Sequence, residues 1–110
     1  MGGRQKIEGW GSSQKGQYMS FVFEWDEEKA DKNLKKHGVG FNEAKTVFND
    51  FFSLTIYDPD HSVNEHRYVD IGLSSKGRLI VVSYSEKGER VRIISCRKAA
   101  KKERKAYEER

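Results

Sequence analysis

Arginine side chains recur in the strand-like second half of the chain, and guanidinium groups pair well with phosphates. Four of them stand on or at the ends of the last three strand-like segments, at Arg67, Arg78, Arg92 and Arg97. Aromatic and hydroxyl side chains lie among them, at Tyr68, Tyr84 and Ser95. Because rings stack on unpaired bases, this combination on an open sheet suits single-stranded RNA. The alternative is that the arginines pair with acids nearby in the sequence, at Glu65, Asp70, Glu86 and Glu89.

Side-chain alternation limits which of these arginines can act together. Arg92 and Arg97 are five residues apart, so they point to opposite faces of an unbroken strand. Both can face one groove only if the strand ends or bulges between them. The sequence leaves both arrangements open.

An acidic loop precedes the Arg67 strand and holds Asp58, Asp60, His61, Glu65 and His66. Its spacing matches no common metal-ligand pattern, so we expect no metal and no other cofactor. Glu65 and Arg67 are alternate residues, which point the same way in a strand. We therefore expect a carboxylate beside a guanidinium at the start of this strand.

Lys36 and His37 end a predicted helix. His37 continues the apolar side of that helix, seven residues after Ala30 and three after Leu34. It is therefore either a hydrogen-bonded core histidine or an acid–base group. Lys36 is expected to project to solvent, where it can reach a phosphate if the groove lies there.

Hydrophobic periodicity and capping residues predict the elements that must position these groups. Asp26 is placed to cap a helix over 27–37 that ends at Gly38, and Gly40 gives a second helix, over 41–48, a weak start. Strands are expected at 21–25, 53–57, 67–73, 78–85 and 90–96, and a last helix at 97–109. The order β-α-α-β-β-β-β-α predicts an α+β fold, with a mostly antiparallel sheet and helices packed on one face.

Length and composition set the broad class. The chain has 110 residues, which suits one domain. Residues 1–18 are rich in Gly, Ser and Gln and show no period, so we expect a disordered extension before a domain over 19–110. Cys96 is the only cysteine, which excludes an internal disulfide. No segment approaches the roughly 20 apolar residues that span a membrane, so we expect a cytoplasmic protein with no membrane contact.

Positive charge is concentrated at the C-terminal end. Residues 97–110 carry seven basic and three acidic side chains, a net +4 that equals the net charge of the whole chain. Such asymmetry indicates a polyanion or an acidic partner, and the alternative is a solvated helix surface. Arg97, Lys98 and Lys101 begin this run and are expected to bind RNA.

Two runs of residues carry a resemblance to a known family. They are W-D-x-x-K-x-x-x-N-x-x-K-H-G-V from Trp25 and R-I-I-S-x-R-x-A-x-x-x-E-R-x-x-Y from Arg92. With the chain around them, from about Phe21 to Glu109, they closely resemble the BrnT family of bacterial toxins. The resemblance implies a RelE-like ribonuclease fold and a toxin of a type II toxin–antitoxin pair, which cleaves RNA and so inhibits translation.

The same resemblance implies partners. A BrnA-type antitoxin, a ribbon-helix-helix DNA-binding protein, is expected to neutralise the toxin and to contact or shift its basic C-terminal helix. The oligomeric toxin–antitoxin complex is expected to bind operator DNA through the antitoxin. Some RelE-like ribonucleases depend on the ribosome for activation, so the ribosome is a further partner to test.

A metal-independent endoribonuclease mechanism can be written with these residues. The RNA 2′-OH attacks the adjacent phosphate, which needs a base, cations and an acid. Glu65 is the expected base, Arg67 and Arg92 are expected to bind the reacting phosphate, and Tyr84 or His37 is expected to protonate the leaving oxygen. The expected RNA-binding residues are Lys36, Arg78, Arg97, Lys98 and Lys101.

Two other functions fit the same sequence. A non-catalytic RNA-binding module would bind RNA in a salt-dependent way and leave it intact. An interaction protein whose basic tail meets an acidic partner would have no affinity for RNA. Growth arrest on expression without an antitoxin would separate the toxin from both.

Overall fold

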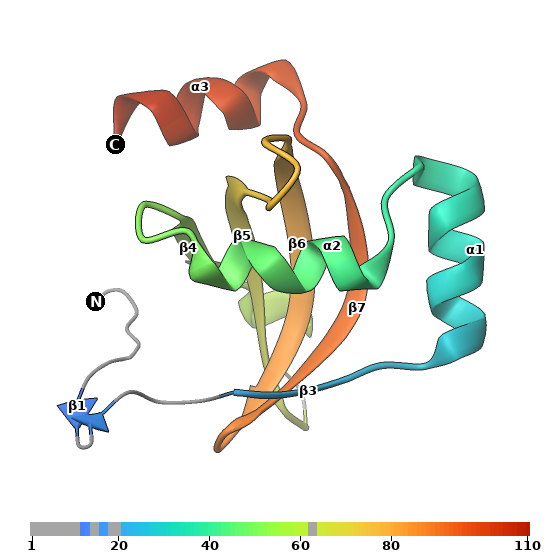
Figure 1. Cartoon of the computed structure of the whole chain (residues 1–110), viewed down its shortest axis with the longest axis vertical. Coiled ribbons are helices and arrows are strands. Elements are labelled where there is room, and N and C mark those ends of the chain that lie inside the picture. The colour runs from blue at the N-terminus through green and yellow to red at the C-terminus, as the bar shows by residue number, and fades with distance from the viewer. Residues whose placement is uncertain (1–11, 14–15, 18–20, 62–63) are drawn as a thin grey trace.

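A five-stranded sheet lies at the centre of the structure, a computed structural model that describes residues 12–13, 16–17, 21–61 and 64–110 (Figure 1). Its strands run in the order β3-β7-β6-β5-β4. Neighbouring strands are antiparallel except β3 and β7, which are parallel. The strands are β3 (Val22–Glu24), β4 (Leu54–Tyr57), β5 (His66–Leu73), β6 (Leu79–Lys87) and β7 (Arg90–Lys98).

Helices flank this sheet. They are α1 (Glu27–His37), α2 (Phe41–Thr46), α3 (Lys101–Glu109) and the short 3-10 helices η1 (Val47–Asn49) and η2 (Pro59–His61). From β3 onward the order of strands and α-helices is the one predicted, and the α+β class is confirmed. Among the described residues, no helix is long and apolar enough to cross a membrane.

The residues before β3 are described only in part. A two-stranded antiparallel ladder joins β1 (Ser12–Ser13) to β2 (Gly16–Gln17). The disorder predicted for residues 1–18 otherwise falls outside the residues that the structure describes. The boundary predicted at residue 19 falls there too, and it stays a prediction.

The first helix has the predicted boundaries because its caps form as expected. Asp26 Oδ1 accepts hydrogen bonds from the backbone N–H groups of Glu28 at 2.9 Å and Lys29 at 3.2 Å. Gly38 ends the helix with a φ of 71°, a conformation that glycine adopts without a steric cost. These local signals place the last turn of α1, with His37, at a defined position.

Asn33 attaches α1 to the sheet. Its side-chain amide donates hydrogen bonds to the carbonyl oxygens of Cys96 at 2.9 Å and Val39 at 3.0 Å, and its Oδ1 accepts one from the Cys96 N–H at 3.1 Å. Asn33 is buried, and burial of an amide is costly unless its polar atoms are paired. The three hydrogen bonds satisfy the amide and hold α1 beside the end of β7.

The two faces of the sheet are covered differently. One face carries the main core, in which β6 and β7 pack against α1, α2 and β3; its buried members include Ile80, Val82, Tyr84, Val91 and Ile93. The opposite face has a smaller cluster at one end, where Ala99 and Tyr107 pack on Ile71, Leu79 and Val81. The prediction that the helices pack on one face is confirmed for α1 and α2. The prediction is wrong for α3. This helix covers the apolar cluster of Ile71, Leu79 and Val81 on the opposite face.

The last helix begins later than predicted. Arg97 and Lys98 still pair with Val81 and Ile80, so β7 continues through both residues. The helix starts at Lys101, and the backbone N–H of Ala100 donates a hydrogen bond of 2.7 Å to Glu103 Oε1. The prediction of a helix from residue 97 was therefore wrong, because strand pairing outweighs the helical propensity of these residues.

The second helix is shorter than the predicted 41–48. It ends at Thr46 and continues as η1. Gly40 supplies no side-chain cap, which agrees with the weak start that the sequence predicted.

Candidate functional site

A β-bulge decides where the arginines of β7 point. Ser83 pairs with Ser95, but the next residue, Tyr84, pairs with Ile93, so Ile94 is an extra residue in β7. The bulge resets the alternation of side chains along the strand. It meets the condition that the sequence set for Arg92 and Arg97 to share one face.

The register confirms this placement. Arg92 pairs with Ser85 and Arg97 pairs with Val81, and these two β6 residues are four apart and share a face. Arg67 of β5 also pairs with Ser85. We call this side of the sheet the open face; it carries Arg67, Ser83, Ser85, Arg92, Ser95 and Arg97.

Polar side chains form successive rows across the open face. Arg67, Ser85 and Arg92 make one row, and Val69, Ser83 and Ser95 make the next. Cross-strand partners are about 5 Å apart and rows on one face about 7 Å apart. Two guanidinium groups therefore flank Ser85, which is itself only 3% exposed. The hydroxyl groups of Ser83 and Ser95 lie one row away, and the pair of guanidinium groups suits an anion.

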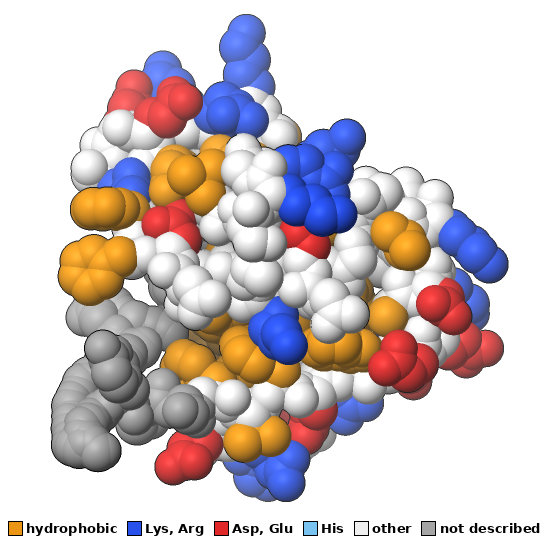
Figure 2. All heavy atoms as spheres, viewed as in Figure 1, with side chains coloured by type: hydrophobic (Ala, Val, Ile, Leu, Met, Phe, Trp, Pro, Cys, Tyr) orange, Lys and Arg blue, Asp and Glu red, His pale blue; other side chains and the backbone are white. Residues whose placement is uncertain are grey.

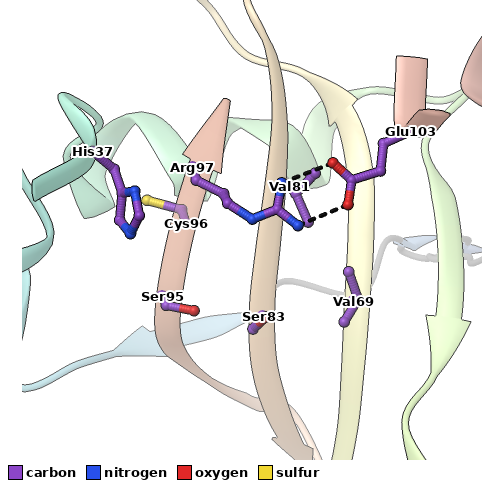
Figure 3. A pocket seen from close by; sticks show the side chains of 8 residues that line it. All are labelled: His37, Val69, Val81, Ser83, Ser95, Cys96, Arg97 and Glu103. Atoms are coloured by element: carbon purple, nitrogen blue, oxygen red, sulfur yellow. Dashed lines mark hydrogen bonds and ion pairs between the residues drawn. The ribbon is translucent and has the colours of Figure 1, made fainter. Parts of the chain in front are cut away.

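A pocket of about 350 Å³ continues this surface toward α3 (Figure 3). Its lining residues are His37, Val69, Val81, Ser83, Ser95, Cys96, Arg97 and Glu103. The Arg97 guanidinium crosses the pocket and pairs with Glu103 through two hydrogen bonds of 2.7 Å. The hydrogen bonds from Arg97 lower the pKa of Glu103 below its ordinary value, so this carboxylate is ionised at neutral pH.

His37 is half-buried and lines this pocket. Figure 3 shows its ring beside Cys96, on the far side of β7 from Glu103. Burial raises the pKa of the Cys96 thiol to about 11, so the thiol is protonated at neutral pH and is a poor nucleophile. His37 is the α1 side chain that lines the pocket.

Glu65 and Arg67 lie close together at the entry to β5, as predicted. Arg67 Nε is 3.9 Å from Glu65 Oε2, and the two side chains are 32% and 38% exposed. This separation is that of a loose ion pair rather than a hydrogen bond. Both side chains are partly exposed, but the Arg67 Nε atom itself is buried.

The tyrosines do not share the open face with the arginines. Tyr84 is 1% exposed, packs in the main core, and donates a hydrogen bond of 2.8 Å to Asp70 Oδ1. Tyr68 pairs with Tyr84 and stacks on its ring. The expectation of aromatic rings beside the arginines was wrong, because consecutive residues of β5 and β6 point to opposite faces.

Arg78 also lies away from the open face. Its guanidinium pairs with the buried Glu43 and donates to the carbonyl oxygen of Gly38 at 3.1 Å. The hydrogen bond from Arg78 lowers the pKa of Glu43 below its ordinary value. Arg78 thus fills a structural role between β6 and α2.

The remaining lysines of the predicted RNA-binding set are exposed but separated. Lys36 is in the last turn of α1, Lys98 ends β7, and Lys101 begins α3. Of the three, Lys98 pairs with Ile80, so it belongs to the face that carries the main core. The structure brings none of them into the rows around Ser85.

Three residues of the site were not singled out from the sequence. Ser83 and Ser85 interrupt the apolar β6 strand at a period of two, a signal that marks the solvent side of a strand. Glu103 was noted only as an acid of the basic tail and as a position of the second family run, with no role assigned, and its pairing with Arg97 depends on where α3 begins. Among the described residues, no three His, Cys, Asp or Glu side chains come together as a metal-ligand group.

Comparisons with known proteins give two matches. Residues 25–103 match a family model described as the ribonuclease toxin BrnT of type II toxin–antitoxin systems. The crystal structure of the Brucella abortus ribonuclease toxin BrnT is similar, with a TM-score of 0.52 and 24% sequence identity, over 76% of this chain and 99% of that chain. At this identity the structural match concerns the fold. None of the curated proteins matches the chain.

Proposed function

The chain belongs to the BrnT family of ribonuclease toxins of type II toxin–antitoxin systems, and we propose that its domain over 19–110 cleaves RNA on the open face. The family implies an RNA target and an antitoxin partner. The observation that carries the location is the shared face of Arg67, Arg92 and Arg97, which the bulge at Ile94 makes possible.

The reacting phosphate is assigned to the row of Arg67, Ser85 and Arg92. These arginines stand on β5 and β7, about 10 Å apart at the backbone. Arginine side chains are long enough to converge on one phosphate from both sides, and a guanidinium–phosphate pair is strong and directional. Arg97, held by Glu103 two rows away, is assigned to another phosphate of the same strand.

The chemistry follows from this placement. The 2′-oxygen forms a bond to the adjacent phosphorus while the bond from phosphorus to the 5′-oxygen breaks, which leaves a 2′,3′-cyclic phosphate. Glu65 beside Arg67 takes the proton of the 2′-OH. The two guanidinium groups stabilise the charge that develops on the phosphate oxygens, so the reaction needs no metal.

The leaving oxygen is assigned a proton from water rather than from Tyr84 or His37. Tyr84 is buried on the opposite face. Glu65, one residue before β5, is four residues or about 13 Å of strand from Val69, which lines the pocket together with His37. We therefore assign Glu65 and His37 to different phosphates. Positioning and charge then supply most of the rate.

The proposed function also includes inhibition of translation and neutralisation of the toxin by an antitoxin. We assign translation inhibition to the cleavage of RNA, either free or on the ribosome. We assign neutralisation to a BrnA-type ribbon-helix-helix antitoxin, through which the complex binds operator DNA. Expression of the chain alone should arrest growth, and co-expression of that antitoxin should restore it.

Cleavage of a defined single-stranded RNA in EDTA tests this function. The wild type is expected to cleave, and Arg67→Ala/Arg92→Ala is expected to lose at least 100-fold in rate, since each electrostatic contact to the transition state is worth about 2–4 kcal/mol. Lys32→Ala/Lys45→Ala is the matched control, because it removes two positive charges from α1 and α2.

If the RNA stays intact with the wild type and with both double variants, cleavage without the ribosome is contradicted. The same assay with translating ribosomes then separates a ribosome-dependent toxin from a non-catalytic RNA-binding module. The module predicts salt-dependent RNA binding with no cleavage under either condition.

A further inference from the structure

Two adjacent phenylalanines protrude from the surface after η1. Phe51 is 92% exposed and Phe52 is 65% exposed, and their rings meet edge to face at 5.7 Å between centroids. Figure 2 shows hydrophobic side chains gathered on this edge of the molecule, next to the C-terminal end of α3. Contiguous exposed apolar side chains of this kind mark contact sites.

Hydrogen bonds to Asp50 hold the backbone of the turn that carries these rings. Asp50 Oδ1 accepts from the Phe52 N–H at 2.9 Å, and Oδ2 accepts from the Leu73 N–H at 2.8 Å and the Tyr107 hydroxyl at 2.6 Å. The turn that carries the rings is thereby tied to the end of β5 and to α3. A turn whose backbone is already ordered loses less entropy when a partner covers it.

Arg110 joins the aromatic side chains into one surface. Its guanidinium carbon lies 4.0 Å from the ring centroid of Tyr107 and 5.6 Å from that of Phe52. Leu73, 43% exposed, adds an aliphatic edge beside Asp50. We call these residues, Phe51, Phe52, Leu73, Tyr107 and Arg110, the Phe51–Phe52 surface.

Its charge setting favours an acidic partner. The α3 segment beside it has five basic side chains, Lys101, Lys102, Arg104, Lys105 and Arg110. Of its three acids, Glu103 is paired with Arg97, and Glu108 and Glu109 lie between Tyr107 and Arg110. The surface thus combines aromatic anchors and an arginine, the side chains enriched among binding hot spots, at the end of a segment whose net charge is positive.

We infer that the Phe51–Phe52 surface is the docking site for an acidic, partly apolar segment of the antitoxin. The inference rests on the proposed function, because membership of a toxin–antitoxin family is what supplies an antitoxin. Leu73 is six residues along β5 from Arg67, about 20 Å of strand. The surface is therefore separate from the row assigned to the reacting phosphate, and the two can be tested independently.

The test measures the affinity of the full chain for the purified antitoxin of its own operon, by titration calorimetry without RNA. Phe51→Ala/Phe52→Ala is expected to weaken binding on the order of 100-fold. Val22→Ala/Leu34→Ala is the matched control, since these side chains are 50% and 51% exposed on β3 and α1. The control is expected to bind like the wild type, and a phenylalanine variant within threefold of the wild type would overturn the inference.

Phe51→Ala alone keeps the test valid if the double variant unfolds. Phe51 is 92% exposed and therefore contributes little to folding. The thermal unfolding midpoint of the Phe51→Ala variant should match that of the wild type. A loss in antitoxin affinity of about tenfold or more supports the inference, and wild-type affinity overturns it.

Other ligands of the Phe51–Phe52 surface would give different results in these experiments. Sedimentation of the free chain that shows a dimer in the wild type and a monomer in the double variant would assign the surface to a second copy and overturn the inference. Lost RNA affinity with unchanged antitoxin affinity would assign it to RNA and overturn it as well. A wild type that binds antitoxin but cleaves no RNA contradicts only the ribonuclease proposal.

Discussion

Arg92 and Arg97 stand five residues apart on one strand and face the same side of the sheet, because Ile94 is an extra residue between them. Arg78, the residue before β6, instead pairs with Glu43 on the other side. The chain therefore uses similar arginines for two purposes. Those of β7 lie on a polar surface, and Arg78 fixes a helix to the sheet.

The first prediction separates these two uses. Arg97→Ala should weaken RNA binding and lower the slope of log affinity against log salt by about 1, because one phosphate contact is lost. Arg78→Ala should leave that slope unchanged but lower the free energy of unfolding by about 2–3 kcal/mol, because Glu43 loses its charged partner. Fluorescence anisotropy and urea denaturation measure the two quantities. The opposite pattern would place Arg78, not Arg97, on the RNA.

The second prediction concerns the buried hydroxyl of Tyr84. Tyr84→Phe keeps the ring in the core but removes the hydrogen bond to Asp70, so it should lower the free energy of unfolding by about 1–2 kcal/mol. RNA cleavage should stay within about threefold of the wild type, because the hydroxyl lies on the face opposite the arginines. A loss of cleavage of 100-fold or more in a folded Tyr84→Phe protein would restore Tyr84 as a catalytic residue.

The third prediction is a loss of stability in acid that depends on Glu43. Its pKa is lowered in the folded state, chiefly by the hydrogen bond from Arg78. The stabilisation is therefore present above the pKa of an unfolded glutamate, about 4.3, and is lost as the pH falls through the lower folded pKa. Urea unfolding from pH 6 to pH 2 should show this decline in the wild type. Glu43→Gln should show a shallower decline, and parallel curves would contradict the assignment.

The fourth prediction is that Gly40→Ser stabilises the chain. Gly40 occupies the N-cap of α2 with extended backbone angles and no side-chain hydrogen bond, and a Cβ at this position would meet no atom within 4 Å. A serine hydroxyl can accept from a free N–H of the first turn and should add a few tenths of a kcal/mol, about 0.2–0.5, to the free energy of unfolding. Gly40→Ala has no such oxygen and is the control. Equal effects from Ser and Ala would exclude capping as the cause.

Local signals predicted most of the fold. Asp26 and Gly38 bound α1 at the residues predicted, because both caps act through neighbouring backbone groups. The start of α3 was missed because Arg97 and Lys98 are held in β7 by pairing with β6. Such pairing depends on residues far away in the sequence, which local patterns do not contain.

The site was predictable only in part, for the same reason. The alternation of side chains along a strand correctly predicted that Glu65 lies beside Arg67. The same alternation puts Arg67 and Tyr68 on opposite faces of β5, and the expectation that aromatic rings lie beside the arginines did not take this into account. The bulge at Ile94 has no local signal in the sequence, because Ile93 and Ile94 are equally suited to a regular strand. The pairing of Arg97 with Glu103 likewise appears only once α3 folds back over the sheet.

The central claim is that a 2′-OH attacks a phosphate held by Arg67 and Arg92. Mass spectrometry of the ends left on a defined oligoribonucleotide, cleaved in EDTA, tests it most directly. The account predicts 2′,3′-cyclic phosphate and 5′-hydroxyl ends from the wild type and from Lys32→Ala/Lys45→Ala, and at least 100-fold less product from Arg67→Ala/Arg92→Ala. Ends with 3′-hydroxyl and 5′-phosphate, or equal product from the double arginine variant, would contradict it.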